Sequence, residues 1–246
     1  MQNYLFHIRR YLRLLARAFQ AKEKFSIYWT EIVTDLTNNG LTSIGLVVII
    51  SVFVGAVLTI QTAYQLEGSF FPITTIGMVV SNSAFLEMAP TITSLVLAGK
   101  IGSNIASQIG TMRITEQIDA LEVMGINSAS YLILPKIVAA LITFPCLIVM
   151  AAFFTHIGGL FAGELTGIIH ESDFLYGAQK YFQLYFVLFM CVKAVAFGFL
   201  IITVSAYQGY HVEGGAVNVA RSSTNAVVYS CILILITNYI LAQIML

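Results

Sequence analysis

Two ionisable residues stand inside long apolar stretches of this sequence. Glu87 is the only Asp, Glu, Lys or Arg in residues 68–99, and Lys193 is the only one in residues 181–212. A charge deep in an apolar segment is costly and usually faces a partner or a wet cavity. A lysine can hold a phosphate as a point charge, and a glutamate can pair with that lysine or with a cationic group. The two residues are a candidate binding site, and the alternative is a buried Glu–Lys pair that only fixes helix packing.

The residue patterns of several enzyme classes are missing. ATP hydrolysis needs a glycine-rich loop with Lys and Ser/Thr, and the nearest match, Gly99-Lys100-Ile101, lacks the upstream glycine and the hydroxyl residue. No Gly-x-Ser-x-Gly occurs, and no His and carboxylates recur at metal-ligand spacing. His156 stands alone and is interpreted as packed or hydrogen-bonded, and His170 and His211 as loop residues. We therefore expect a non-catalytic chain with no cofactor and no metal site.

Composition indicates a membrane protein. Of 246 residues, 58% are hydrophobic and only 10% are charged, with a mean hydropathy of +0.86. A soluble domain has about 25% charged residues, so soluble enzyme folds are excluded. The net charge is zero, which gives no reason to expect nucleic acid as a partner. Cys146, Cys191 and Cys231 lie in apolar runs and are interpreted as small buried hydrophobic residues without a disulfide.

Five apolar stretches are long enough to cross a membrane, which takes ~20 residues in a helix. We place them near 43–65, 86–108, 133–158, 182–206 and 222–244. Residues 70–85 could be a re-entrant or surface segment that leads into the second span. The predicted fold class is an all-α integral membrane protein, with a five-span domain over residues 36–246. Gly159, Gly163 and Gly167 follow each other at four-residue spacing, which permits close helix contact.

Residues 1–35 are predicted to contain an amphipathic helix that lies in the membrane interface, and they show no signal peptide. Apolar residues recur three and four apart, and basic residues flank them. The apolar set is Leu5, Ile8, Leu12, Leu15 and Phe19, and the basic set is Arg9, Arg10, Arg13 and Arg17. Tyr28 and Trp29 follow, and these residue types suit the headgroup zone. The alternative is a helix packed on a partner protein.

The positions of basic residues predict the orientation. Six of the twelve precede the first span, and Lys100, Arg113 and Lys136 lie around the loop between spans two and three. The positive-inside rule then puts the N-terminus and the 109–132 loop in the cytoplasm. Five spans put the C-terminus on the opposite side.

That loop has the pattern of a short amphipathic helix over about 111–125, with Gly125 as its stop. Its apolar stripe is Ile114, Ile118, Leu121 and Met124, and its charged residues are Arg113, Glu116, Asp119 and Glu122. Such a helix either lies on the membrane or docks into a groove of a soluble partner. Membrane-surface helices favour basic polar faces, and this one is net acidic, which favours a protein partner.

These residues resemble those of the MlaE-type permeases, the membrane subunits of ABC systems that move phospholipids and other lipids across the bacterial envelope. The resemblance covers nearly the whole chain. It is carried by Ala98–Gly102 with Gly110–Gly125, by Leu86-Glu-Met-Ala-Pro90, by Tyr207-Gln-Gly-Tyr with Gly214-Gly215, and by Ala220–Val228. Family members usually have Gly where Ala89 stands and often Ala-Thr-Thr at 222–224, which are small-for-small changes.

The resemblance implies partners and a location. The loop helix would be a coupling helix in a cleft of a cytosolic ATPase subunit, where ATP and Mg²⁺ are expected on the partner chain. The family permease is a homodimer with two ATPase subunits and usually an MCE-domain lipid-binding protein. The chain would lie in the bacterial inner membrane, with its N-terminus cytoplasmic and its C-terminus periplasmic.

Three groups of candidate site residues follow. The predicted ATPase contacts are Arg113, Glu116, Asp119 and Glu122, with Ile118 and Leu121 as apolar anchors. The predicted lipid-binding residues are Glu87, Lys193, Phe85, Leu86, Phe189 and Phe197. The predicted dimer interface is on span five, at Ser222, Ser223, Thr224 and Ala226, because small residues allow close approach. The alternative for this last group is packing within one protomer.

Other function classes fit less well. A stand-alone secondary transporter tends to show internal repeats with broken helices. Five spans cannot divide into equal halves, and no repeat is visible. A membrane enzyme acting on lipids would need a catalytic cluster, and none is present. A lipid-binding membrane scaffold is a further alternative.

Overall fold

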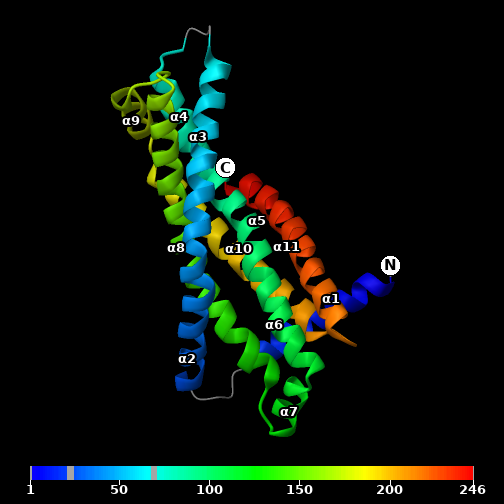
Figure 1. The fold of residues 1–246 in the computed structure, drawn as a ribbon. Helices are drawn as coiled ribbons and strands as arrows, with labels where there is room; N and C mark the ends of the chain where they lie inside the picture. The colour runs from blue at the N-terminus through cyan, green and yellow to red at the C-terminus, as the bar shows by residue number, and fades with distance from the viewer. Residues whose placement is uncertain (1, 21–24, 68–70, 246) are drawn as a thin grey trace. The chain divides into compact units, whose positions relative to one another are not determined.

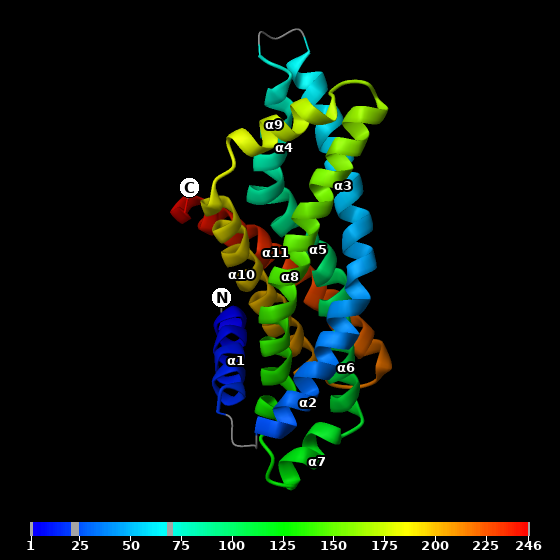
Figure 2. The ribbon, with the colours of Figure 1, turned by 90° about the vertical axis from the view of Figure 1, so that its left-hand side faces the viewer.

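The computed structural model describes residues 2–20, 25–67 and 71–245, which are helical almost throughout (Figures 1 and 2). The helices are α1 Gln2–Ala18, α2 Phe25–Asp35, α3 Ile44–Leu66, α4 Thr74–Ser83, α5 Thr93–Leu97, α6 Ser103–Ile114, α7 Gln117–Val123, α8 Ser128–Leu165, α9 Glu171–Lys180, α10 Leu184–Tyr210 and α11 Ala216–Met245. Short 3-10 or π-helical segments, Leu36–Gly40, Leu41–Ser43, Ala84–Ile92 and Ala98–Gly102, join some of them without a break. No strand occurs in the described ranges.

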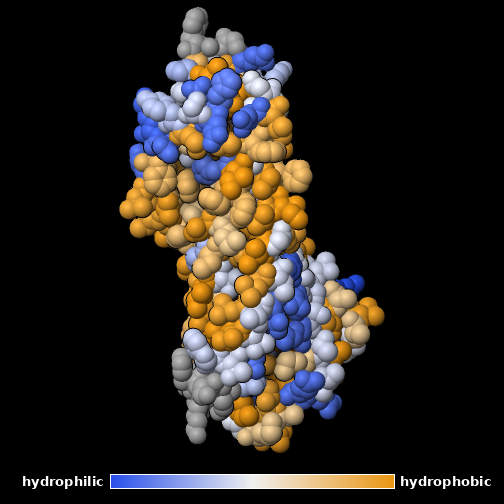
Figure 3. All heavy atoms as spheres, turned by 60° about the vertical axis from the view of Figure 1, so that its left-hand side comes forward, coloured by the Kyte–Doolittle hydropathy of each residue, from blue (hydrophilic) through white to orange (hydrophobic). Residues whose placement is uncertain are grey.

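Five of the resulting helical stretches are long and apolar enough to cross a membrane. They are Tyr28–Leu66, Thr74–Ile114, Ser128–Leu165, Leu184–Tyr210 and Ala216–Met245. The five predicted spans are confirmed, although each helix is longer than its prediction. Hydrophobic side chains cover broad areas of the face drawn in Figure 3, as expected of a surface in contact with acyl chains. The protein is an all-α, multi-pass membrane protein with an additional N-terminal helix.

Two predicted boundaries differ from the structure. Residues 28–35, assigned to the interfacial region, continue into the first span as one helix. Residues 74–83, assigned to a re-entrant or surface segment, form α4 and continue into the second span. Pro72 precedes α4, and its carbonyl accepts the Thr75 N–H at 2.9 Å. A proline in front of a helix is compatible with helix initiation. The Thr- and Ser-rich residues that follow form a helix all the same.

The chain forms two compact units, each built from three segments. The first unit contains Met1–Leu41, Leu95–Thr143 and Ala196–Thr237. The second contains Thr42–Ser94, Phe144–Val195 and Asn238–Leu246.

In the second unit, α3 and α8 meet backbone to backbone. A Cβ atom added to Gly55 would lie 1.8 Å from the Thr155 carbonyl oxygen, and one added to Gly158 would lie 2.0 Å from the Val52 oxygen. Gly159 of the predicted glycine series also faces α3, with a Cβ position 2.6 Å from Thr59 Oγ1. Small residues at such contacts let membrane helices approach closely.

The helix α9 was missed in the sequence and packs against α4 in the same unit (Figures 1 and 2). A Cβ on Gly77 would lie 2.2 Å from the Phe174 oxygen, and one on Gly177 would lie 1.9 Å from the Thr74 oxygen. Gly167, with φ +69°, is in the turn after α8. The segment between spans three and four is therefore a packed helix rather than an open loop.

In the first unit, a buried ion pair joins the start of the first span to α8. Lys136 Nζ donates to both carboxylate oxygens of Asp35, at 3.1 and 3.2 Å, and to Gln108 Oε1 at 2.9 Å. Both charged side chains are almost fully buried. Three acceptor atoms satisfy the ammonium, which is the condition under which a buried charge is tolerated.

Candidate functional site

The loop between spans two and three contains a shorter helix than predicted. The stretch 111–125 is divided, because α6 ends at Ile114 and α7 covers only Gln117–Val123. Glu116 lies between them with φ 61°, a left-handed conformation that interrupts the α-helix. Gly125, with φ 79°, follows the end of α7, in agreement with its predicted role as the stop.

The apolar residues of α7 divide into an inner and an outer group. Ile118 is 0% exposed and packs inside its own unit, so it is not available as an anchor for another protein. Leu121 is half-buried. Val123 is 89% exposed and Met124 is 66% exposed. The exposed apolar surface is therefore the C-terminal end of α7, formed by Val123 and Met124. The sequence pattern had instead predicted Ile118 and Leu121 as the apolar anchors.

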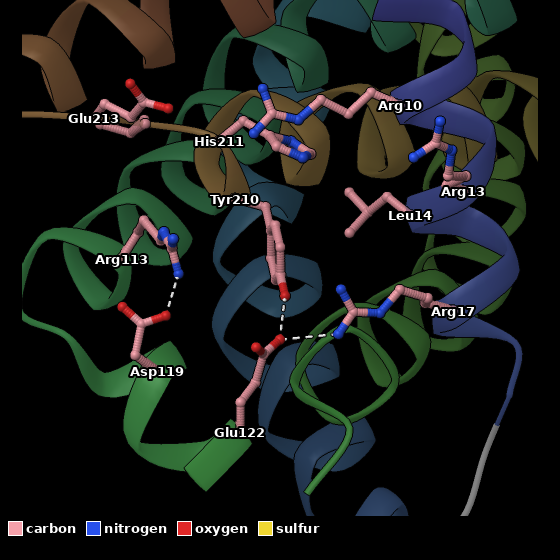
Figure 4. A pocket seen from close by; sticks show the side chains of 11 residues that line it. Arg10, Arg13, Leu14, Arg17, Arg113, Asp119, Glu122, Tyr210, His211 and Glu213 are labelled. Carbon is pink, nitrogen blue, oxygen red and sulfur yellow. Dashed lines mark hydrogen bonds and ion pairs between the residues drawn. The ribbon is translucent and has the colours of Figure 1, made fainter.

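The charged residues of this region form internal ion pairs (Figure 4). Arg113 Nη1 lies 2.6 Å from Asp119 Oδ1, and Arg17 Nη2 lies 2.9 Å from Glu122 Oε1. Among the predicted contact residues, Glu116 is exposed and has no ion pair among the described residues. Arg113, Asp119 and Glu122 thus have a structural role within the protomer in addition to any contact they make with another chain.

Glu122 connects α7 to three other elements. Its Oε1 accepts hydrogen bonds from Arg17 of α1, from Ser128 Oγ of α8 at 2.9 Å and from the Tyr210 hydroxyl of α10 at 3.1 Å. The Ser128 hydroxyl, followed by Arg17 and Tyr210, lowers the pKa of Glu122 because these donors stabilise the carboxylate more than the acid. This side chain holds α7 in place.

The helix α1 packs against the end of α10. The Tyr11 hydroxyl donates to Thr203 Oγ1 at 2.8 Å, and His7 Nδ1 lies 2.8 Å from the Tyr207 hydroxyl. Burial raises the pKa of Tyr11 because the phenolate is poorly solvated there. Leu14 is buried on this face.

Apolar residues on a neighbouring side of α1 stay uncovered. Ile8, Leu12 and Phe19 are exposed. An amphipathic helix with an uncovered apolar stripe fits the predicted interfacial helix. Arg10, Arg13 and Arg17 of α1 border a different surface within the unit.

That surface is a polar cavity of about 430 Å³ in the first unit (Figure 4). It is lined by Arg10, Arg13, Leu14 and Arg17 of α1, Arg113 of α6, Asp119 and Glu122 of α7, Tyr210 of α10, and His211, Val212 and Glu213 of the following loop. Burial lowers the pKa of His211, and the nearby Arg10, Arg113 and His7 lower it further because they repel a second positive charge. His211 and His170 lie outside helices, as predicted.

The second unit brings Glu87 and Lys193 together. Lys193 Nζ lies 2.7 Å from Glu87 Oε1 and also donates to the Leu86 carbonyl oxygen at 2.7 Å. Pro90, which has no N–H, lies within the π-helical segment Ala84–Ile92, and the lysine ammonium is an additional donor to the Leu86 carbonyl. Glu87 Oε2 accepts hydrogen bonds from Asn238 Nδ2 at 2.9 Å and from Thr91 Oγ1 at 3.2 Å.

The other residues predicted to bind lipid differ in how far they are exposed. Phe189 stacks under the ammonium of Lys193, with 4.5 Å from Nζ to the ring centroid, and is fully buried. Phe197 is fully buried in the first unit, so neither ring lines an open path in this structure. Leu86 is half-buried. Phe85 lines an apolar cavity of about 470 Å³ in the second unit.

His156 lines the same cavity and is hydrogen-bonded, as predicted. Its Nδ1 lies 2.7 Å from the Ala152 carbonyl oxygen, which only accepts, so Nδ1 carries the proton. Its Nε2 lies 3.0 Å from Ser81 Oγ and accepts from that hydroxyl. The cysteines are free thiols, and Cys146 is exposed rather than buried, because it lies on the outer surface of an apolar helix. Within the described residues, no three His, Cys, Asp or Glu side chains gather to hold a metal ion.

The predicted dimer residues fall on two faces of α11. Ser222 and Ala226 are buried in the protomer, and Ser222 Oγ donates to the Gln208 carbonyl oxygen at 2.7 Å. Ser223 is half-buried and Thr224 is exposed. For Ser222 and Ala226, the structure supports the alternative of packing within one protomer.

Comparison with known proteins agrees with this architecture. The family described as Permease MlaE matches residues 32–244. A probable ABC transporter permease protein of Rickettsia bellii is 38% identical over 88% of this chain and 83% of its own length. A probable ABC transporter permease protein of Synechocystis is 37% identical over 84% of this chain and 78% of its own length. The chloroplastic protein TRIGALACTOSYLDIACYLGLYCEROL 1 of Arabidopsis thaliana is 31% identical over 89% of this chain and 63% of its own length.

The helical architecture defines a multi-pass membrane protein with a short helix in the loop between its second and third spans. The match over residues 32–244 goes further: the chain belongs to the MlaE permease family.

Proposed function

We propose that this chain is the membrane permease subunit of an ABC-type transporter that moves phospholipid or a related lipid between the inner membrane and the outer envelope. The family membership carries the proposal. Two relatives that cover most of this chain are named probable ABC transporter permease proteins. A third relative is named after a lipid, trigalactosyldiacylglycerol. A separate ATPase subunit, with its ATP and Mg²⁺, supplies the energy, and an MCE-domain protein exchanges the lipid on the far side.

In this proposal, α7 is the coupling helix. Its exposed apolar end, Val123 and Met124, enters a cleft of the ATPase, and Glu116 contacts the rim of that cleft. Two permease copies and two ATPase subunits form the complex, with the N-terminus and α7 on the cytoplasmic side. A few residues near the centre of an interface usually carry most of its binding energy.

The proposed lipid contact is at Glu87 and its apolar neighbours. Glu87 keeps 38% of its side chain exposed, whereas Lys193 keeps 0%. A cationic headgroup can therefore reach the carboxylate directly. Contact between a phosphate and the lysine requires that the Glu87–Lys193 pair first opens, and Phe85 and Leu86 then offer apolar contact to the acyl chains.

A reconstitution experiment tests this function. The tagged chain is purified with its associated proteins from its native membranes and placed in liposomes of phosphatidylethanolamine and phosphatidylglycerol that contain a fluorescent phospholipid. Extraction of the fluorescent lipid is expected to require ATP and to stop when the α7 end is altered by Val123→Asp. ATP-independent extraction that an ionophore abolishes would instead support a stand-alone secondary transporter, and absence of any associated ATPase would contradict the proposal.

A further inference from the structure

The polar cavity between α1 and α7 carries more positive charge than its internal ion pairs use. Four arginines line it against three carboxylates. Arg17 pairs with Glu122 and Arg113 pairs with Asp119. In the part of the chain that the structure describes, no carboxylate lies within ion-pair distance of Arg10 or Arg13. Arg10 has a ring contact, with its guanidinium carbon 5.9 Å from the centroid of Phe6.

Most of the arginines of α1 that line the cavity face away from the apolar stripe of this helix. Successive residues of an α-helix are about 100° apart. Ile8 and Leu12 of α1, with Phe19 directly after the helix, therefore share one side. Arg10 and Arg17 lie roughly on the opposite side, and Arg13 borders both the cavity and the surface around Ile8 and Leu12. Figure 4 shows Arg10 reaching from α1 toward His211, above the pairs that hold α7. If the apolar stripe contacts acyl chains, the cavity opens to the aqueous side.

The cavity also adjoins the helix that is proposed to contact the ATPase. Asp119 and Glu122 of α7 form part of its wall, and Val123 and Met124, which directly follow Glu122, are exposed. A protein seated on the end of α7 would extend over the mouth of the cavity. Guanidinium groups bind carboxylates in bidentate pairs, which give geometric specificity as well as energy.

We infer that this cavity receives an acidic segment of the soluble ATPase subunit, whose carboxylates pair with Arg10 and Arg13. The contact area of the partner then includes α1 as well as α7. The inference rests on the proposed function, because it names a second contact of the same partner. Since Arg17 of α1 already pairs with Glu122 of α7, partner carboxylates bound to Arg10 and Arg13 would hold a helix that is tethered to the coupling helix.

Affinity measurements with matched variants test the inference. The parent, Arg10→Gln/Arg13→Gln, Arg10→Lys/Arg13→Lys and Arg9→Gln are purified in detergent, and binding of the isolated ATPase subunit is titrated at several salt concentrations. Arg9 is the matched control, because it is a basic residue of the same helix that does not line the cavity. The circular dichroism and thermal midpoint of each variant report whether it is folded.

The glutamine pair is expected to weaken ATPase binding at least about tenfold and to reduce its salt dependence. Arg9→Gln should bind like the parent, and the lysine pair should fall between parent and glutamine pair, because it keeps charge and loses bidentate geometry. Equal binding by the parent and the folded glutamine pair would overturn the inference and leave the proposed function intact. If the ATPase binds none of the proteins, parent included, the proposed function itself fails.

Two further outcomes identify a different ligand. Inorganic phosphate, added without the ATPase, could raise the thermal midpoint of the parent and not of the glutamine pair. Phosphatidylglycerol micelles, compared with phosphatidylcholine micelles of the same chain length, could do the same. Either result together with unchanged ATPase affinity would overturn the inference, because the cavity would then be a small-anion or lipid-headgroup site.

Discussion

Lys193 and Glu87 form a closed pair in which the ammonium is fully enclosed, with 2.7 Å between Nζ and Oε1. The Leu86 carbonyl and the Phe189 ring occupy other sides of the ammonium. Asn238 and Thr91 occupy the second carboxylate oxygen. Such complete satisfaction is what makes a charge in an apolar helix tolerable. It also means that a lipid phosphate has no direct access to Lys193.

Lys193→Ala is expected to destabilise the protein. It leaves Glu87 without its cation and the Leu86 carbonyl without this donor. The cost should be about 3 kcal/mol, at the low end for a broken buried pair because Glu87 is partly exposed. Thermal denaturation in detergent measures it, and the double variant Glu87→Gln/Lys193→Met should recover most of the midpoint. A stable Lys193→Ala protein that retains less phospholipid would contradict this expectation and favour a phosphate site at Lys193.

The end of α7 gives a prediction about assembly. Val123→Asp places a charge on a side chain that is 89% exposed, so the permease should fold normally. ATPase binding should weaken at least about tenfold, because the charge would be unpaired inside a closed interface. Leu121→Asp is a less specific test, since Leu121 is half-buried and the change also disturbs the packing of α7. Pull-down of the ATPase measures the effect, and Val123→Leu is the control that keeps an apolar contact.

The lowered pKa of Glu122 predicts that the stability of α7 depends on pH. Its pKa is lowered in the folded protein, first by the Ser128 hydroxyl. A lowered pKa contributes stability that is present above the pKa of an unfolded glutamate, about 4.3, and that is lost as the pH falls through the folded value. Proteolytic cleavage within α7 should therefore be slow at neutral pH and increase in the acid range below about 4. In Glu122→Gln, cleavage should be faster at neutral pH and lack this acid step, and an unchanged neutral rate would contradict the tethering role.

The spans could be predicted from the sequence because the absence of charge over some twenty residues is a strong signal. The division of the loop helix at Glu116 could not, since a left-handed non-glycine residue has no distinct sequence signature. The short helix α9 was also missed, because its ten residues have a mixed composition and its position depends on backbone contact with Gly77. Helices of this length are stabilised mainly by packing.

Pairing between distant residues was predicted in one case and missed in another. Glu87 and Lys193 were found because each is alone in an apolar run. Lys136 and Asp35 form a pair in which both side chains are almost fully buried, but Asp35 precedes the first predicted span and Lys136 lies at the start of the third, where charges are ordinary. The sequence also could not decide whether Ser222 and Ala226 face the inside of the protomer or a second copy, because small residues serve both kinds of contact equally well.

The α3–α8 contact gives a prediction about stability. Gly55→Ala places a methyl group 1.8 Å from the Thr155 carbonyl oxygen, so the helices must separate. The expected cost is about 1–3 kcal/mol, typical of overpacking, measured by thermal denaturation in detergent. Gly45 of the same helix is the control, since its Cβ position would have no tertiary contact within 4 Å. Gly45→Ala should be neutral or stabilise by up to about 1 kcal/mol through helix propensity, and equal midpoints for both variants would contradict the close approach.

The exposed face of α11 gives the last prediction, which concerns the proposed homodimer. In a variant without native cysteines, Thr224→Cys and Val228→Cys place thiols on the outer face of the helix. Mild oxidation in native membranes should give a crosslinked dimer at one or both positions, because disulfides form only when two Cα atoms are within about 7 Å. Ser222→Cys and Ala226→Cys are the controls, since both side chains are buried in the protomer and should remain reduced. Crosslinking at the buried positions alone would mean that α11 is turned the other way in the membrane, and no crosslink at either outer position would place the dimer contact on another span.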